Sequence, residues 1–371
     1  MTLHIRQAML AALTGWAAPA AGADFQACIA EEARRKDYSG VVAVTEGGAP
    51  MTIVVRGETG APGSGAITAD TRFNIGSAGK MFTAVAVAQL VDAGKVAFDD
   101  PVGKYIPSLK PEARAVTLHQ LLTHTSGLGD YFSPGSIGAV QAARRATDLL
   151  PLIAADQPQF APGTQFRYSN SGFALLGMVV EAVSGQDYSA YMDEHIFKPA
   201  KMMSTSLEAG SPQTVAVGMT RLPPMTPGSG PVRMGPGPGP GGMPPADGPL
   251  RPAPGAAVRG SPSGGAFSTA ADLQRFMAAF RAGQLTKSTA VLSAAKVDAG
   301  RGLSYAYGFG VTTAVGRAWF GHNGGTPGAN AEVIASADGK WFIAALANRD
   351  PPLATEMLRY IQRVLETGSC S

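Results

Sequence analysis

Ser77 and Lys80 are residues whose types and spacing could carry out chemistry. They lie between an extended run, Thr71 to Gly76, and an apolar run, Met81 to Val91. If a helix begins at or just before Ser77, the hydroxyl and the amine fall one turn apart on the same helix face. A serine hydroxyl is a weak nucleophile until a nearby base takes its proton, and a neutral amine can be that base.

Burial lowers the pKa of a lysine, so an apolar setting would supply the neutral amine that this chemistry needs. The spacing itself is not distinctive, because Ser293 and Lys296 repeat it. The pair therefore has to be judged by its surroundings in the rest of the chain.

Composition limits the classes of protein to consider. The chain has 371 residues, of which 45% are hydrophobic and 15% charged, so it can bury a sizeable core in one large domain or two lobes. The formal net charge is +3, and no dense run of Lys and Arg interleaves with aromatic residues. We therefore expect no nucleic acid partner.

The N-terminus is typical of an exported protein. A basic start at His4 and Arg6 precedes an apolar stretch, Ala8 to Ala18, and the small residues Ala21 to Ala23 form a cleavage site. A membrane anchor is the alternative, but the stretch is short for a bilayer. We predict that residues 1–23 are a signal peptide, that the mature protein is periplasmic or secreted, and that it keeps no stable membrane insertion.

Two cysteines, Cys28 and Cys370, remain after the predicted cleavage. In an oxidising compartment they could bridge and tie the two ends of the mature chain together, or they could remain unpaired thiols. The sequence leaves both possibilities open.

Hydrophobic patterns place strands at both ends of the chain. Strands are predicted over 41–45, 51–56 and 71–75, after a helix over 27–36, and a helix that follows Ser77 ends near Gly94. Further strands are predicted over 307–312, 318–322, 331–336 and 341–347, between helices that begin near Thr269 and Leu353. We therefore expect one sheet built from both termini.

The middle of the chain is predicted to be mostly helical. Helical patterns cover 139–155, 171–184 and 188–197, and Thr117 with Gln120 fits a capping box. Residues 223–255 are rich in proline and glycine and are predicted to be a mobile insertion. The predicted domain, 24–371, thus has an α/β lobe (24–95 and 256–371), a helical lobe (96–222) and this insertion.

Two further motifs follow Ser77 and Lys80 in order. Tyr168, Ser169 and Asn170 lie in a loop ahead of a helix, and the run His322 to Gly325 ends a predicted strand. The three motifs, together with Leu121 to Leu128, resemble the serine β-lactamase and penicillin-binding-protein family, in the branch of class C β-lactamases, D-alanyl-D-alanine carboxypeptidases and family VIII esterases. The resemblance covers nearly the whole mature chain.

The resemblance implies an α+β, β-lactamase/transpeptidase-like fold, with an antiparallel sheet flanked by helices and a mostly helical lobe. It also implies site roles. Ser77 would be the nucleophile, Lys80 and Tyr168 would share its proton, and Asn170 would hold Lys80 and the substrate carbonyl. Positive charge from Lys80 would favour the Tyr168 phenolate or a shared proton.

The same resemblance implies an oxyanion hole and a substrate-binding strand. The backbone N–H groups of Ser77 and Gly325 would stabilise the oxyanion. The strand segment that would bind substrate has four residues: His322, Asn323, Gly324 and Gly325. His124 is expected to have a structural role next to the site rather than to contact the substrate.

The third motif departs from the Lys-Thr-Gly of class C β-lactamases, because His322 and Asn323 replace the lysine and the threonine. A histidine is mostly neutral at pH 7, so strong β-lactamase activity is not expected. If His322 binds a substrate carboxylate as imidazolium, affinity for anionic substrates should fall between about pH 5.5 and 7.5. Trp319 to Gly321 offers a second register for the motif, of the Trp-x-Gly form of some family VIII esterases.

The sequence gives little support to an α/β-hydrolase or to a metal enzyme. The Gly-x-Ser-x-Gly pentad of α/β-hydrolases does not occur. There is no cysteine cluster, and the spacing of His119 and His124 does not suit a metal site. We expect no metal and no cofactor.

The leading hypothesis is an exported serine hydrolase that forms an acyl-enzyme on Ser77 and hydrolyses small esters or peptide-like amides. A D-alanyl-D-alanine carboxypeptidase or a weak β-lactamase is the alternative of the same class. A non-catalytic protein that binds cell-wall peptides with the same fold is the alternative of another class.

Overall fold

The computed structural model describes residues 23–61, 63–131, 136–155, 158–210, 214–222, 248–253 and 260–370. Nearly all of the predicted signal peptide, residues 1–22, and most of the predicted insertion, residues 223–247 and 254–255, lie outside the described residues. In the described part of that insertion, the strand β5 (Arg251–Pro252) pairs with β4 (Met219–Thr220). This end of the predicted insertion is therefore held in regular structure.

One antiparallel sheet of eight strands, ordered β2-β1-β12-β11-β10-β9-β8-β7, organises the described chain. Its N-terminal strands are β1 (Gly40–Glu46) and β2 (Thr52–Arg56). Its C-terminal strands are β7 (Val297–Gly300), β8 (Leu303–Tyr305), β9 (Gly310–Ala314), β10 (Arg317–Thr326), β11 (Ala329–Ser336) and β12 (Trp341–Ala347). Because β1 pairs with β12, the two termini build one sheet, as the sequence predicted.

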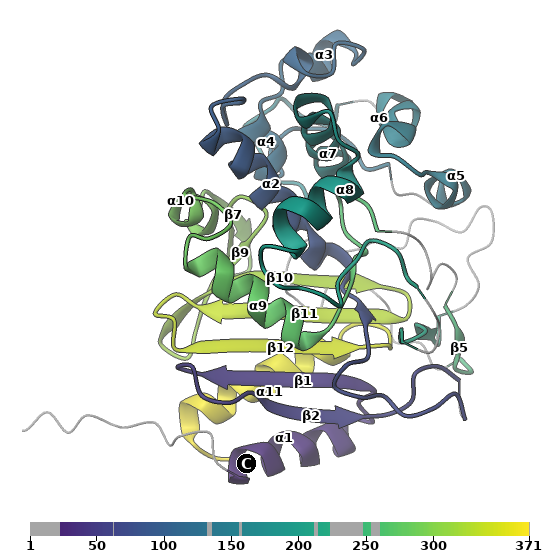
Figure 1. Cartoon of the computed structure of the whole chain (residues 1–371), viewed down its shortest axis with the longest axis vertical. Helices are drawn as coiled ribbons and strands as arrows, with labels where there is room; N and C mark the ends of the chain where they lie inside the picture. The colour runs from purple at the N-terminus through teal and green to yellow at the C-terminus, as the bar shows by residue number, and fades with distance from the viewer. Residues whose placement is uncertain are drawn as a thin grey trace, which may run out of the picture.

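Helices cover both faces of this sheet. On one face, α1 (Ala23–Arg35) and α11 (Leu353–Thr367) pack against the strands and against each other. On the other face lie α9 (Ala270–Arg281) and α2 (Lys80–Asp92), as Figure 1 shows for α9. A disulfide between Cys28 and Cys370 joins α1 to the residues after α11. The sequence had left this bond open.

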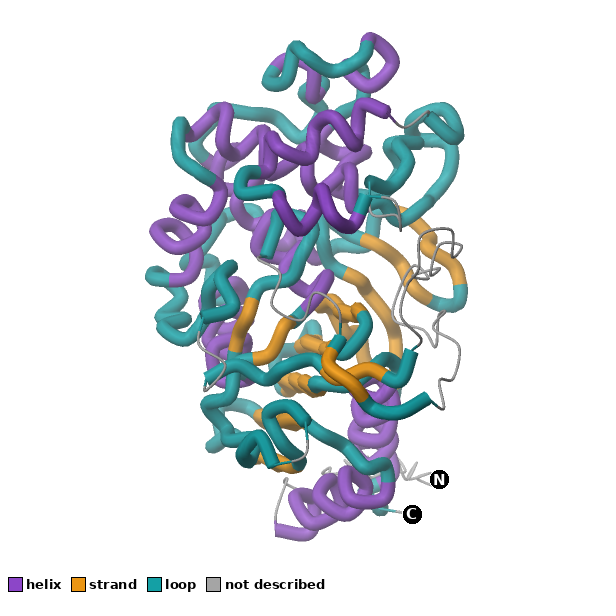
Figure 2. The backbone as a smooth tube through the Cα atoms, turned by 90° about the vertical axis from the view of Figure 1, so that its right-hand side faces the viewer, coloured by secondary structure: helices purple, strands orange, loops and turns teal. Residues whose placement is uncertain are grey.

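The helical lobe stands beyond one long edge of the sheet (Figures 1 and 2). Its longest helix, α7 (Asn170–Ser184), packs along α2. The shorter helices are α3 (Pro111–Arg114), α4 (Leu118–Leu122), α5 (Ile137–Ala142), α6 (Leu150–Ala155) and α8 (Tyr188–Met192). Other short elements include α10 (Thr289–Ser293) and the two-stranded ladder of β3 (Phe73–Asn74) with β6 (Phe267–Ser268).

The predicted helix over 139–155 is broken in the structure. After α5 the chain turns, and a 3-10 turn (Ala146–Leu149) precedes α6. The Asp148 carboxylate accepts hydrogen bonds from the backbone N–H of Arg144, at 2.7 Å, and of Arg145, at 2.9 Å. An aspartate that bonds backbone N–H groups in this way starts a new helical segment rather than continuing the old one.

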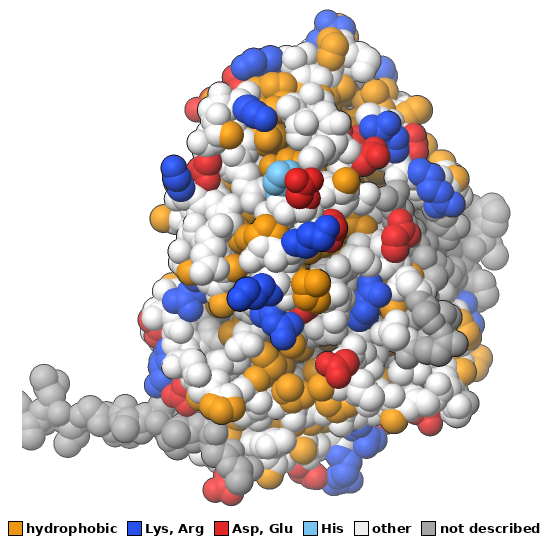
Figure 3. Space-filling model, viewed as in Figure 1, with side chains coloured by type: hydrophobic (Ala, Val, Ile, Leu, Met, Phe, Trp, Pro, Cys, Tyr) orange, Lys and Arg blue, Asp and Glu red, His pale blue; other side chains and the backbone are white. Residues whose placement is uncertain are grey.

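The surface shows no segregation of charge on the face seen in Figure 3, where basic and acidic side chains are interspersed. Among the helices that the structure describes, none has the length and apolar character needed to cross a bilayer.

Candidate active site

Ser77 lies on a 3-10 turn (Gly76–Gly79) between β3 and α2, where it lines a cavity of ≈ 370 Å³. The turn packs closely against β10. Gly76 has φ +50°, and a Cβ there would lie 2.9 Å from the backbone nitrogen of Gly325. A side chain could not fit at this contact, so glycine allows the turn to carry Ser77 up to the strand.

Lys80 is the first residue of α2 and is fully buried. Its Nζ lies 3.3 Å from Ser77 Oγ, 2.8 Å from Asn170 Oδ1 and 2.5 Å from the backbone oxygen of Ser263. A neutral amine has two hydrogens, which can be donated to the amide and the carbonyl. Its lone pair then remains for the Ser77 hydroxyl proton.

The charge state of Lys80 follows from its surroundings. Burial lowers the pKa of Lys80 to about 7, although the Asp130 carboxylate acts in the opposite direction. A large fraction of this amine is therefore neutral at neutral pH, which is the state in which it can deprotonate a serine.

Tyr168 sits over Lys80, whose Nζ lies 4.7 Å from the centre of the phenol ring. Burial raises the pKa of Tyr168, and the nearby Ser77 hydroxyl only partly offsets this rise. The phenol hydroxyl is buried and makes no hydrogen bond of ordinary geometry with the described residues. Of the two expected states, the phenolate is contradicted because burial favours the neutral phenol, whereas a proton shared with Lys80 stays a prediction. Tyr168 can therefore donate a proton but is a poor first base.

Asn170 bridges Lys80 and Asp130. Ser169 caps α7 by accepting a bond from the Gly172 N–H, so the Asn170 side chain is not used as the cap. Its Oδ1 accepts from Lys80, and its Nδ2 donates to Asp130 Oδ2 at 3.0 Å. Because Lys80 donates and the Asp130 carboxylate accepts, these two partners fix which way the amide points.

Sequence reasoning missed Asp130, Tyr131 and Ser263. Asp130 and Tyr131 come shortly after the run that ends at Leu128, where an acidic residue in the loop was the available signal. Ser263 contributes its backbone oxygen to Lys80, and its hydroxyl lies 2.6 Å from that of Tyr131. A backbone contact of this kind leaves no signature in residue type.

His124 has a structural role next to the site, as expected, because it contacts Ser169 and Tyr168. It is buried, its Nδ1 accepts a hydrogen bond from the Ser169 N–H at 3.2 Å, and its ring centre lies 4.3 Å from that of Tyr168. It therefore positions the loop that carries Tyr168 and Asn170.

The proposed oxyanion donors come together at the end of β10. Pairing of β9 with β10 stops at Gly321, so the segment that ends at Thr326 has an edge free of β9. Gly325 lines the same cavity as Ser77. At Gly324 a Cβ would lie 1.9 Å from the backbone oxygen of Ile75. Glycine at this position lets β10 pack directly on the turn that bears the nucleophile.

His322 and Asn323 line a different cavity from Ser77. His322 Nδ1 lies 2.5 Å from the backbone oxygen of Asn323 and therefore donates to it, which leaves Nε2 to accept from Tyr305 at 2.9 Å. Burial lowers the pKa of His322 to about 3, with a further contribution from Lys80. The ring is neutral between pH 5.5 and 7.5, so the expectation that an imidazolium binds a carboxylate was wrong.

The second Ser-x-x-Lys pair does not form a site. The Ser293 hydroxyl donates to the backbone oxygen of Thr289 in its own helix, at 3.0 Å. Lys296 Nζ lies over the ring of Tyr307, 5.1 Å from its centre. The two members of this pair thus have other partners.

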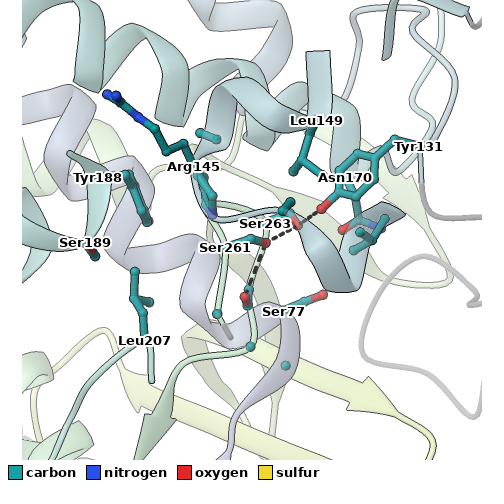
Figure 4. Close-up of a pocket in the computed structure, with 18 of the residues that line it drawn as sticks. Ser77, Tyr131, Arg145, Leu149, Asn170, Tyr188, Ser189, Leu207, Ser261 and Ser263 are labelled. Atoms are coloured by element: carbon teal, nitrogen blue, oxygen red, sulfur yellow. Dashed lines mark hydrogen bonds between the residues drawn. The ribbon is translucent and has the colours of Figure 1, made fainter. Parts of the chain in front are cut away.

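The cavity at Ser77 extends away from the nucleophile, past Ser261 and Ser263, toward Tyr188 and Leu207, as Figure 4 shows. Arg145 and Asp187, which form an ion pair at 3.0 Å, also line it. The cavity therefore combines a hydroxyl-rich wall near the nucleophile with apolar and charged groups farther out.

The pattern of the family described as Beta-lactamase matches residues 25–366. The chain belongs to the β-lactamase family. The residues of the candidate active site and the β-lactamase/transpeptidase-like fold agree with this membership, and a penicillin-binding protein has a similar fold.

Individual proteins are similar to this chain in fold or in part of the sequence. A penicillin-binding protein from Bacillus halodurans is 28% identical and superposes with a TM-score of 0.77 over 91% of this chain and 98% of that one. A D-stereospecific amidohydrolase from Streptomyces sp. has the same fold, with a TM-score of 0.74 and 24% identity over 93% of this chain and 99% of that one. Protein flp of Staphylococcus aureus is 32% identical over 146 residues, or 37% of this chain, and the match spans only 28% of protein flp.

Proposed function

We propose that the protein is an exported serine hydrolase that forms an acyl-enzyme on Ser77 and hydrolyses small esters or peptide-like amides. One observation carries the proposal: a buried Lys80 with a pKa of about 7 lies 3.3 Å from Ser77 Oγ. Export is proposed from the N-terminal sequence.

Acylation begins when the neutral Lys80 amine takes the Ser77 hydroxyl proton as Oγ attacks the substrate carbonyl carbon. The carbonyl oxygen becomes an oxyanion, which the backbone N–H groups of Ser77 and Gly325 can stabilise. The tetrahedral intermediate then collapses, and the bond to the leaving group breaks. The leaving group takes a proton from the Tyr168 phenol, which regains one from the Lys80 ammonium.

Hydrolysis of the acyl-enzyme repeats these steps with water in place of serine. Lys80 is neutral again after acylation and can accept a proton from an attacking water, directly or through Tyr168. Ser77 then leaves with that proton, which restores the starting state. Asn170 keeps the Lys80 amine oriented in both half-reactions.

Uncharged acyl substrates fit the site better than substrates that need a cation at the third motif. His322 is neutral and its ring nitrogens are engaged by Tyr305 and Asn323. This favours esters and neutral amides over the alternative of a D-alanyl-D-alanine carboxypeptidase or a weak β-lactamase.

The alternative of a non-catalytic peptide-binding protein has less support. A binding protein has no need of a depressed lysine pKa beside a serine, and the hydrogen bonds of Lys80 to Asn170 and Ser263 hold the amine next to the Ser77 hydroxyl, as acyl transfer requires.

The test is burst kinetics with an activated ester such as p-nitrophenyl acetate. We expect a burst of about one equivalent of p-nitrophenolate, followed by slower turnover. In Ser77→Ala both phases should disappear, with a rate loss of several orders of magnitude. Unchanged turnover in this variant would exclude the proposed function. The Ser293→Ala variant is the matched control, and it should behave as the parent protein does.

A further inference from the structure

A second cavity, of ≈ 250 Å³, lies beside β10 and shares no lining residue with the cavity at Ser77. Its walls come mainly from β9, β10, β11 and α11, with further residues from β8 and the turn before it. Tyr168 and His322 are among its lining residues, so this cavity borders the tyrosine of the candidate active site. The volume suits a ligand much smaller than the drug-sized molecules that typical pockets accept.

Glu332 is the feature of this cavity that needs explanation. It lies on β11, directly opposite Asn323 in the strand register, and only 1% of it is exposed. Its Oε1 accepts a hydrogen bond from the Thr355 hydroxyl at 2.6 Å, whereas Oε2 is buried and has no partner among the described residues. A buried carboxylate oxygen without a partner is costly, so a ligand that donates to it would gain binding energy.

Basic side chains lie at the outer part of the same cavity. Arg359 and Arg301 line it and are exposed to solvent. The charge of Arg359 acts on Glu332 and lowers the pKa of its carboxyl, although burial raises that pKa to about 7 overall. The cavity thus offers a buried acceptor and solvent-exposed guanidinium donors.

We propose that this cavity binds a small zwitterion of the α-amino acid type. The ligand ammonium would donate to Glu332 Oε2, and the ligand carboxylate would lie toward Arg359 and Arg301, where a guanidinium can form paired hydrogen bonds. An ammonium supplies the donors that the buried oxygen lacks and compensates its charge. The cavity borders Tyr168, so a ligand bound there would change the surroundings of this residue of the candidate active site.

Glu181 provides a matched control within the same chain. It too is buried, with an unpartnered Oε2, but it lines the cavity at Ser77. The variants Glu332→Gln and Glu181→Gln therefore make the same chemical change in the two cavities. A ligand in the second cavity should respond to the first variant and not to the second.

The experiment is calorimetric titration of the Ser77→Ala protein with glycine, D-alanine and L-alanine, and with the half-ligands ethylamine and propionate, to about 10 mM. We expect saturable binding of at least one amino acid, with each half-ligand at least tenfold weaker. Glu332→Gln and Arg359→Ala should each weaken binding about ten- to a hundredfold, whereas Glu181→Gln should leave it within about twofold.

Two outcomes would overturn the proposal. One is the absence of saturable binding for all three amino acids in a folded protein. The other is binding that Glu181→Gln weakens and Glu332→Gln does not, which would place the ligand in the cavity at Ser77. If Glu332→Gln is unfolded, Thr312→Tyr, which fills the cavity from β9, replaces it, and unchanged binding in that variant would also overturn the proposal. None of these results depends on turnover at Ser77, so they are independent of the proposed function.

Discussion

Asp130 is expected to set the pH at which Lys80 becomes an effective base. Its carboxylate is held by both the backbone N–H and the side-chain Nδ2 of Asn170, at 3.1 and 3.0 Å. The substitution Asp130→Asn keeps an oxygen acceptor for these bonds and removes the negative charge. Without that charge the Lys80 ammonium loses a stabilising partner, so the pKa of Lys80 should fall further below its usual range.

The size of the shift follows from the chain of hydrogen bonds. Asp130 Oδ2 lies 3.0 Å from Asn170 Nδ2, and Asn170 Oδ1 lies 2.8 Å from Lys80 Nζ. With roughly 2.3 Å between the N and O of the amide, the carboxylate is within about 8 Å of Lys80 Nζ. At an effective dielectric constant of about 20 to 40, the attraction is about 1 to 2 kcal/mol, or roughly one pKa unit. The pKa of Lys80 should therefore move from about 7 to about 6.

The assay is the pH dependence of kcat/KM for an activated neutral ester, since its acidic limb reports the free enzyme's base. The midpoint should move down by about one unit, so that activity relative to the plateau at pH 6 rises about fivefold. Asp187→Asn, which removes a carboxylate paired with Arg145 in the same cavity, should leave the midpoint in place. An unshifted or raised midpoint in Asp130→Asn would refute the electrostatic reasoning.

Three further predictions concern the base, the buried acid and the packing of β10. Lys80→Met should lower kcat/KM by about 10² to 10⁴ while the protein stays folded by circular dichroism; near-parental turnover would mean that another group is the base. Burial raises the pKa of Glu332 to about 7, so this carboxyl stays protonated to higher pH in the folded protein than in the unfolded chain. The free energy of unfolding should therefore fall as pH rises from about 4.5 to 7. Glu332→Gln should therefore stabilise the protein at pH 8 relative to pH 5, by up to about 3 kcal/mol in urea titrations; an equal effect at both pH values would contradict this. Gly324→Ala places a Cβ 1.9 Å from the Ile75 backbone oxygen and should abolish the ester burst. The control Gly138→Ala, with open space at its Cβ, should keep the burst. A normal burst in Gly324→Ala would show that the turn can move without loss of function.

Much of the fold could be predicted because its signals are local. The capping box of Thr117 and Gln120 forms with both of its hydrogen bonds, and the helix expected to start near Thr269 is capped by the Thr269 hydroxyl. The break after α5 was missed because it depends on a side chain, Asp148, that bonds backbone groups instead of facing solvent. The strand β7, with the sequence Val-Asp-Ala-Gly, was missed because it has no run of β-branched or aromatic residues.

The site was harder to predict than the fold because its chemistry depends on burial. Residue types and order pointed to Ser77, Lys80 and Tyr168. The charge states of Tyr168 and His322 could not be inferred, because desolvation decides both and is set by residues far away in the chain. The charge of Asp130 acts on Lys80 because the fold brings both residues to Asn170, and the sequence does not show this proximity.

The central claim is that Ser77 is the residue that becomes acylated. The most direct measurement is intact-protein and peptide mass spectrometry after reaction with a fluorophosphonate, which traps activated serines. We predict one equivalent of adduct on the peptide that contains Ser77, and none in Ser77→Ala. An adduct of the same stoichiometry in Ser77→Ala, or one located at Ser293, would contradict the account.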